Sequence, residues 1–272
     1  MTRVKVGTLY IDHELRGAGP PLLMVPGFRR SRAVWMEPLL TLLAERFSLV
    51  LIDNRGTGNS DKPEDGYSIE GFADDAAGLL DALGIARAHV FGVSMGGMIA
   101  QRIATRHPHK VSRLVIGCSH CGRSGAVPPE PHVLDLLRLM PNDSMDEMEV
   151  AYRQEEVSFT PTFRRQNRAL LDTLFQALNA NPTPAFAVAG HLAALEAFDA
   201  CGDLGAIRAP TLFITGQDDR LIVPENSRSM ARTIPGARLV ELPQAGHLFW
   251  VEKPRETAEA LIEFLIVQGG SK

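Results

Sequence analysis

Short runs of apolar residues alternate along this chain with longer segments in which apolar residues recur every three or four positions. The short runs have strand length, and most are apolar throughout, as expected of strands that are covered on both faces. They lie at residues 22–25, 47–52, 89–91, 111–116, 210–215 and 238–242. The periodic segments 35–45, 69–83 and 98–107 predict helices between these strands. Alternating strands and helices predict an α/β fold, in which helices flank a mostly parallel central sheet.

This alternation stops between residues 122 and 200, where helical periodicity continues without a convincing strand pattern. The helical segments cover residues 131–140, 144–156, 161–178 and 184–197. We therefore predict an α/β core formed by residues 1–121 and 201–272, with an all-helical cap inserted at residues 122–200.

Composition and charge limit the possible partners. The chain has 272 residues, of which 45% are hydrophobic and 22% charged, and its formal net charge is −4. These values are typical of a folded globular protein, and without runs of basic residues we expect no nucleic acid partner. The first residues lack the apolar core of a secretory signal, and no run approaches the ~20 apolar residues of a membrane span. We expect a cytoplasmic protein without membrane insertion, and a homo-oligomer is compatible with the sequence.

The cysteines are few. Cys118 and Cys121 form a C-x-x-C pattern around His120, and Cys201 stands alone. A zinc site at such a pair would need a second pair of ligands at similar spacing. An odd, sparse number of cysteines also does not indicate a disulfide framework. We therefore expect no metal site, and we interpret the pair as small residues at the end of a buried strand.

A candidate nucleophile lies where the apolar run 89–91 meets the following helix. Residues 92–96 read G-V-S-M-G, which matches the G-x-S-x-G motif that places a serine on a sharp turn between a strand and a helix. Such a turn forces Ser94 into strained dihedrals and crowds its neighbours, and Gly92 and Gly96 relieve the crowding because they lack a side chain. The helix N-terminus after Ser94 would direct free N–H groups toward a developing oxyanion.

A serine hydroxyl needs a general base, and the base needs a carboxylate that holds its tautomer. His247 is the best-placed histidine, because it follows the last predicted strand on a loop before a C-terminal helix. The carboxylate is expected on an earlier loop after a strand, where Asp218 and Asp219 are adjacent candidates. Other histidines, interpreted as surface or helix-end residues, are His13, His107, His109, His132 and His191.

The sequence resembles members of the α/β-hydrolase superfamily, of the lidded esterase and enol-lactonase type. The motifs that carry this resemblance cover nearly the whole chain. In order, they are P-G-F at 26–28, D-N-R-G-T-G-N-S at 53–60, the serine motif at 92–96, G-Q-D-D at 216–219 and G-H at 246–247. The order Ser, Asp, His is also the order of that superfamily.

The resemblance implies a catalytic triad of Ser94, Asp219 and His247, because the family's acid commonly lies three residues after a glycine that ends a strand. It further implies an oxyanion hole formed by the backbone N–H groups of Met95 and Phe28. The loop at 26–28 lacks the histidine that often precedes the family's glycine, but main-chain donors should not depend on it. The turn that contains Asp53 and Arg55 is interpreted as structural.

From these features we expect a serine hydrolase that cleaves a small-molecule carboxylic ester or lactone through an acyl-enzyme, without a cofactor. Carbon–carbon bond hydrolysis and cofactor-free perhydrolysis would use the same triad, and a non-catalytic small-molecule receptor is a third alternative. The expected substrate-binding residues are Phe28, His120, Met140, Phe163 and Leu248. They predict a mostly apolar site, although Arg164 and Arg165 offer an alternative way to bind a carboxylate.

Overall fold

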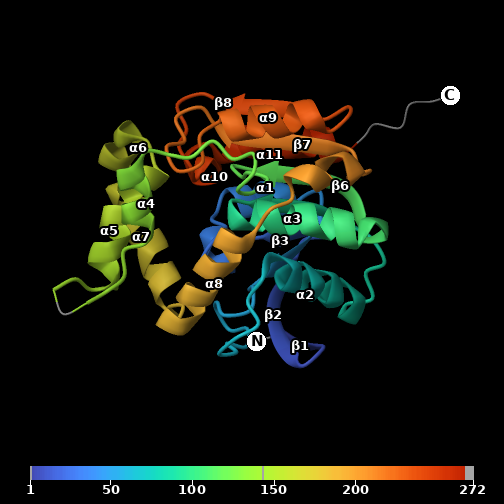
Figure 1. Cartoon of the computed structure of the whole chain (residues 1–272), viewed down its shortest axis with the longest axis horizontal. Helices are drawn as coiled ribbons and strands as arrows, with labels where there is room; N and C mark the ends of the chain where they lie inside the picture. Colours follow the sequence, from blue (N-terminus) through green and yellow to red (C-terminus); the bar gives the residue numbers. More distant parts are fainter. Residues whose placement is uncertain (1, 143, 267–272) are drawn as a thin grey trace.

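A computed structural model describes residues 2–142 and 144–266, and within them an eight-stranded sheet forms the centre of the molecule (Figure 1). The strands are β1 (Thr2–Val6), β2 (Leu9–Arg16), β3 (Pro21–Val25), β4 (Ser48–Ile52), β5 (Ala88–Val93), β6 (Val111–Gly117), β7 (Thr211–Gly216) and β8 (Arg238–Leu242). Their order across the sheet is β1-β2-β4-β3-β5-β6-β7-β8. From β4 to β8 across this order all neighbours are parallel, whereas β1 and β2 pair antiparallel. The predicted α/β fold is confirmed.

Helices cover both faces of the sheet, which explains the uninterrupted apolar runs. The helices of the core are α1 (Leu39–Ala44), α2 (Ile69–Ala82), α3 (Met95–Arg106), α9 (Glu225–Thr233), α10 (Phe249–Glu252) and α11 (Pro254–Leu265). Along β5, Val90 packs in one hydrophobic cluster with residues of α2 and α3, and the next residue, Phe91, packs in another with residues of α1 and α11. Successive strand residues point to opposite faces, so both must be apolar where both faces are covered.

Between β6 and β7 the chain forms the helices α4 (Pro131–Leu137), α5 (Glu147–Ser158), α6 (Pro161–Gln166), α7 (Arg168–Asn179) and α8 (Ala185–Ala197). Figure 1 shows α4 to α7 gathered beside the core, with α8 leading back to it. The helix expected at 161–178 is divided, because Asn167 leaves the helical conformation with φ −124° and ψ 35°. We call the segment 122–200 the cap below.

The N-terminal strands β1 and β2 and the helix α9 were not anticipated from the sequence pattern. The hairpin of β1 and β2 lies at the edge of the sheet, where much of β1 is exposed, so its residues alternate with charges and form no continuous apolar run. The buried face of α9 is largely polar and includes Asn226 and Ser227. Neither pattern has the apolar period that predicts these elements.

The expectation for the cysteines was wrong, because Cys121 and Cys201 form a disulfide across 80 residues. The two ends of the cap run side by side: Gly122 forms a β-bridge with Asp199, and the N–H of Ala200 donates to the carbonyl of Cys121 at 2.6 Å. The cysteine that looked isolated in the sequence is therefore brought next to its partner by the return of the chain. Cys118, the other half of the C-x-x-C pattern, is a buried free thiol.

Across residues 2–142 and 144–266, no helix has both the length and the apolar character that crossing a membrane requires.

Candidate active site

Ser94 occupies the turn between β5 and α3 in a backbone conformation that L-residues rarely adopt, with φ 57° and ψ −123°. The helix begins at Met95, three residues earlier than its apolar period indicated, so the serine directly precedes the first turn of α3. A Cβ on Gly92 would lie 2.0 Å from the carbonyl oxygen of Gly96, and one on Gly96 would lie 2.1 Å from that of Val25. Only glycine fits at either position, because these contacts are with backbone atoms.

His247 and Asp219 form a buried hydrogen-bonded pair at the carboxyl end of the sheet. The Nδ1 atom of His247 lies 2.8 Å from Oδ2 of Asp219. The other carboxylate oxygen, Oδ1, accepts hydrogen bonds from the N–H groups of Leu221 at 2.8 Å and Ile222 at 2.9 Å. These bonds fix the carboxylate plane toward the imidazole. Asp218, the alternative candidate, is exposed.

The electrostatics of this pair favour a charged imidazole. Burial is the largest single influence and lowers the pKa of His247, but Asp219 and Cys118 together outweigh it and hold that pKa well above its ordinary range. The pair would therefore stabilise the imidazolium that forms when His247 accepts a proton.

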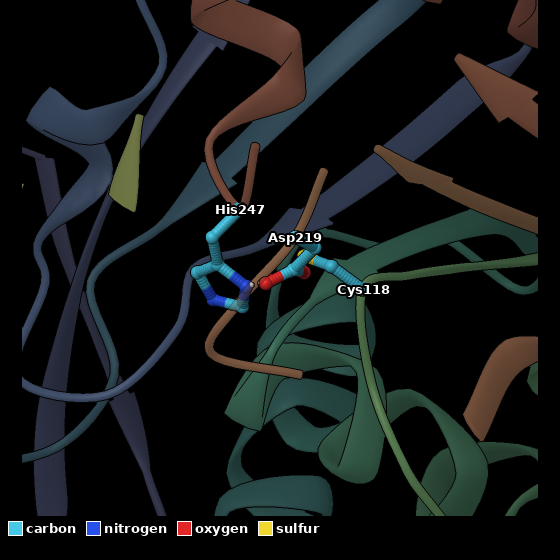
Figure 2. A group of neighbouring side chains, drawn as sticks. All are labelled: Cys118, Asp219 and His247. Atoms are coloured by element: carbon cyan, nitrogen blue, oxygen red, sulfur yellow. Dashed lines mark hydrogen bonds and ion pairs between the residues drawn. The ribbon is translucent and has the colours of Figure 1, made fainter. Parts of the chain in front are cut away.

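Figure 2 shows the thiol of Cys118 behind the same carboxylate. One ligand atom each of Cys118, Asp219 and His247 lies within 4.8 Å of the others, and all three residues are buried. These are atoms that a soft cation could bind, but Asp219 and His247 already satisfy each other, and burial raises the pKa of the Cys118 thiol. We therefore interpret Cys118 as a neutral thiol packed against the pair.

The loop after β3 approaches the serine closely. A Cβ on Gly27 would lie 3.1 Å from Cβ of Ser94, so the absence of a side chain there lets the loop pass over the nucleophile. Among the described residues, no acceptor receives a hydrogen bond from the N–H of Phe28 or from that of Met95. Both donors are therefore available for a substrate oxygen, and their role as an oxyanion hole stays a prediction.

Two cap residues that the sequence analysis did not single out for the site hold the next residue of this loop. Arg29 has φ 50°, its N–H donates to Nδ1 of His191 at 3.4 Å, and its carbonyl accepts from the hydroxyl of Thr183 at 3.2 Å. Nε2 of His191 lies 3.1 Å from the carbonyl oxygen of Arg55, which fits a neutral ring with its proton on Nε2. Burial lowers the pKa of His191 to about 4, in agreement with that form. His191 had been interpreted as a surface or helix-end residue and is instead fully buried.

Cap residues also contact the loop that carries His247. The N–H of Leu248 donates to the carbonyl of Ser158 at 2.9 Å. The buried carboxylate of Glu252 accepts from the N–H of Gly246 and from both the N–H and the hydroxyl of Thr160, each of the latter at 2.8 Å. The cap thus contacts both loops that adjoin the serine.

A family model described as alpha/beta hydrolase fold matches residues 20–254. The chain belongs to the alpha/beta hydrolase family. It is 32% identical to a protein of Caulobacter sp. (strain K31) named "Putative carbamate hydrolase RutD", over 93% of this chain and 94% of that protein. It superposes on the enol-lactonase from Burkholderia xenovorans LB400 with a TM-score of 0.83 and 25% identity, over 97% of this chain and 99% of the other. A thermophilic esterase from Thermogutta terrifontis, with malate bound, gives a TM-score of 0.83 and 27% identity over 97% and 98%.

In this alpha/beta hydrolase Ser94 lies between two cavities of different character. The larger, of about 320 Å³, is lined mainly by apolar side chains. These include Phe28, Met98, Val127, Leu134, Leu137, Leu192, Leu195, Leu221 and Ile222. The smaller, of about 50 Å³, contains Ser94 and His247 together with the polar residues Arg29, Arg30, Gln154 and Ser158. We call these the large lobe and the small lobe.

The structure places some of the expected substrate-binding residues at these lobes. Phe28 lines both, His120 lines the large lobe, and Leu248 lines the small lobe. Met140 lies apart, with its sulfur 3.6 Å from a guanidinium nitrogen of Arg29. Phe163 stacks on Phe159 and lines a separate cleft of about 820 Å³ that does not include Ser94. The spacing of apolar residues in the cap did not predict which side chains line the lobes at Ser94.

The residues interpreted as structural have local partners. The guanidinium of Arg55 forms two hydrogen bonds with the carboxylate of Asp75, at 2.6 and 2.7 Å. Asp53 accepts from the N–H of Arg32 at 2.7 Å and pairs with its guanidinium at 2.5 Å. Both aspartates are buried, so these ion pairs hold the turn after β4 in place.

Proposed function

We propose that Ser94, His247 and Asp219 form a catalytic triad that hydrolyses carboxylic esters or lactones of small molecules. The observation that carries the proposal is the buried pair of His247 and Asp219, 2.8 Å apart, which shares the small lobe with Ser94 through its imidazole. A base held by a carboxylate beside a serine in a strained turn is the arrangement that activates a hydroxyl.

In this proposal Oγ of Ser94 attacks the substrate carbonyl carbon while Nε2 of His247 takes the hydroxyl proton. The Asp219 carboxylate keeps the other ring proton on Nδ1 and stabilises the imidazolium. The carbonyl oxygen, now negative, accepts hydrogen bonds from the N–H groups of Met95 and Phe28. His247 then returns its proton to the leaving alkoxide, and a water activated by the same histidine hydrolyses the acyl-enzyme.

The small lobe is close-fitting and the large lobe is apolar, which suits a substrate with one short arm and one apolar arm at the scissile bond. The relatives named as an esterase and an enol-lactonase support the ester or lactone class. Carbamate hydrolysis is a second candidate, favoured by the relative of 32% identity whose name carries that activity. The same attack on a carbamate carbonyl would expel an amine or an alcohol instead.

The test uses a fluorophosphonate probe, which phosphonylates an activated serine and yields a stable adduct. We expect one adduct by intact mass at neutral pH, located on Ser94 by peptide mapping and absent from Ser94→Ala. Turnover of 4-nitrophenyl butyrate should be lost in the same variant, and a matched 4-nitrophenyl carbamate tests the second candidate. Folded protein without an adduct, or full turnover by Ser94→Ala, would refute the triad.

A further inference from the structure

Arg29 and Arg30 are adjacent in the loop after β3, and their surroundings differ. The guanidinium of Arg29 donates to the carbonyl of Leu139 at 3.2 Å and pairs with the carboxylate of Glu147 at 3.4 Å. The guanidinium of Arg30 has no hydrogen-bond acceptor and no ion-pair partner among residues 2–142 and 144–266. Arg30 is partly buried, and a guanidinium that pairs with none of these residues keeps its N–H donors available to a ligand.

Arg30 lines the small lobe beside Ser94 and His247. Glu147 is the carboxylate that acts on both arginines, but it already pairs with Arg29, so two guanidinium groups share one negative charge and one positive charge is left over. Burial, with the nearby charge of Arg29, lowers the pKa of Arg30 to about 10. The side chain therefore stays protonated and positively charged at neutral pH.

We infer that Arg30 binds a carboxylate carried on the short arm of the substrate, while the apolar arm occupies the large lobe. Guanidinium and carboxylate match in plane and charge, and a carboxylate would supply the acceptors that the described residues do not. The lobe of about 50 Å³ limits this arm to a few atoms, so the carboxylate lies close to the scissile carbonyl. The inference rests on the proposed function and narrows its substrate class to anionic esters or lactones.

The test compares esters that differ only in charge. Monohexyl succinate carries a carboxylate on a short acyl arm, and hexyl 4-methylpentanoate is its neutral isostere. O-Hexanoylglycolate and isobutyl hexanoate form the corresponding pair with the charge on the alcohol side. We expect wild-type protein to prefer the anionic ester in one of the two pairs by at least tenfold in kcat/KM.

Arg30→Met should lower kcat/KM for the preferred anionic ester by about 10- to 100-fold, which is the range for one hydrogen-bonded ion pair, mainly through KM. The neutral isostere should change by less than threefold, because the oxyanion donors and the triad are untouched. Arg30→Lys keeps the charge without the planar fork and should restore part of the preference. The matched control is Arg255→Met on the exposed part of α11, which should leave both substrates unchanged.

Binding separates this inference from the proposed chemistry. In Ser94→Ala, calorimetry should show monohexyl succinate or O-hexanoylglycolate binding about 10- to 100-fold more tightly than in the double variant with Arg30→Met. If wild-type protein hydrolyses no ester and this difference is found, the proposed function fails and the carboxylate site stands. If Arg30→Met weakens neutral and anionic esters equally, or if neither pair shows a charge preference, the inference is overturned.

Discussion

Replacing Asp219 with Asn tests the proposed triad, because the hydrogen bonds of this side chain fix how the substituted amide must be oriented. The two backbone N–H groups of Leu221 and Ile222 donate to one carboxylate oxygen. In the variant the amide oxygen must take that position, because an NH₂ group there would face two donors. The NH₂ group is then directed at Nδ1 of His247, where the carboxylate oxygen lay 2.8 Å away.

This orientation reverses the tautomer of the imidazole. A donor facing Nδ1 makes that atom an acceptor and moves the ring proton to Nε2, the atom that must accept the serine proton. The variant also removes the negative charge that stabilises the imidazolium of His247. We expect kcat to fall by about 10³ to 10⁴, equivalent to about 4 to 5.5 kcal/mol of transition-state stabilisation, with little change in fold.

The assay is the steady-state hydrolysis of 4-nitrophenyl butyrate at pH 8, with thermal unfolding measured in parallel. Asp218→Asn is the matched control, because that side chain is exposed on the same turn, and we expect a loss of tenfold or less. A decrease below tenfold in Asp219→Asn, or a larger defect in Asp218→Asn, would refute the assigned acid.

Three further predictions follow from the site. Since its pKa is raised, His247 should lose its proton above pH 6.5, so the acidic limb of the kcat/KM profile lies above that value and moves to lower pH in Asp219→Asn; an unmoved limb would contradict this. Gly96→Ala should lower the free energy of unfolding in denaturant by about 3 kcal/mol or more, because its methyl group would lie 2.1 Å from a backbone oxygen. Gly27→Ala should lower the same free energy by under about 1 kcal/mol. It should still lower turnover, because its methyl group would lie 3.6 Å from Oγ of Ser94. His191 is buried and neutral with a pKa near 4, so as the pH falls the unfolded state binds this proton first. The free energy of unfolding should therefore decrease between pH 6.5 and 4, by about 2 to 3 kcal/mol at pH 4.5. His191→Gln should remove this part of the decrease, and an equal decrease in wild type and variant would contradict the prediction.

The strands of the parallel sheet were predictable because their chemistry is set by burial on both faces. A strand such as β5 must be apolar at nearly every position, and few other structures require that. The edge hairpin of β1 and β2 was not predictable by the same rule, since its exposed face admits charges. The disulfide between Cys121 and Cys201 depends on where a long insertion returns, which local spacing does not encode. Disulfides are rare in cytosolic proteins, so this bond weighs against the cytoplasmic location, which stays a prediction.

Some features of the candidate site could likewise be predicted from the sequence, and others could not. Ser94, with its flanking glycines, could be found from sequence because a sharp turn imposes local requirements on adjacent positions. The contribution of the cap could not be found in this way, because His191 and Thr183 contact Arg29, in the loop after β3, although they lie more than a hundred positions away in the sequence. In the sequence, His191 appears only as a histidine in a mostly apolar helix, and the role of such a residue depends on partners that the sequence does not show.

Two pairs of adjacent arginines show that the ion-pair partner of an arginine, and not its sequence context, determines whether it is available to a ligand. In the sequence, Arg164 and Arg165 form an adjacent pair that could bind a carboxylate, and the pair at 29–30 has the same composition. In the structure, Arg164 lies 3.9 Å from the buried carboxylate of Glu155, and Arg165 is exposed on α6. Arg30, in contrast, lines the lobe that contains the serine and pairs with no carboxylate among the described residues. A guanidinium that already pairs with a carboxylate of the protein is less available to an anionic ligand. Arg30 can therefore be singled out as the proposed binding group only once the ion pairs of the described residues are known, which the sequence does not give.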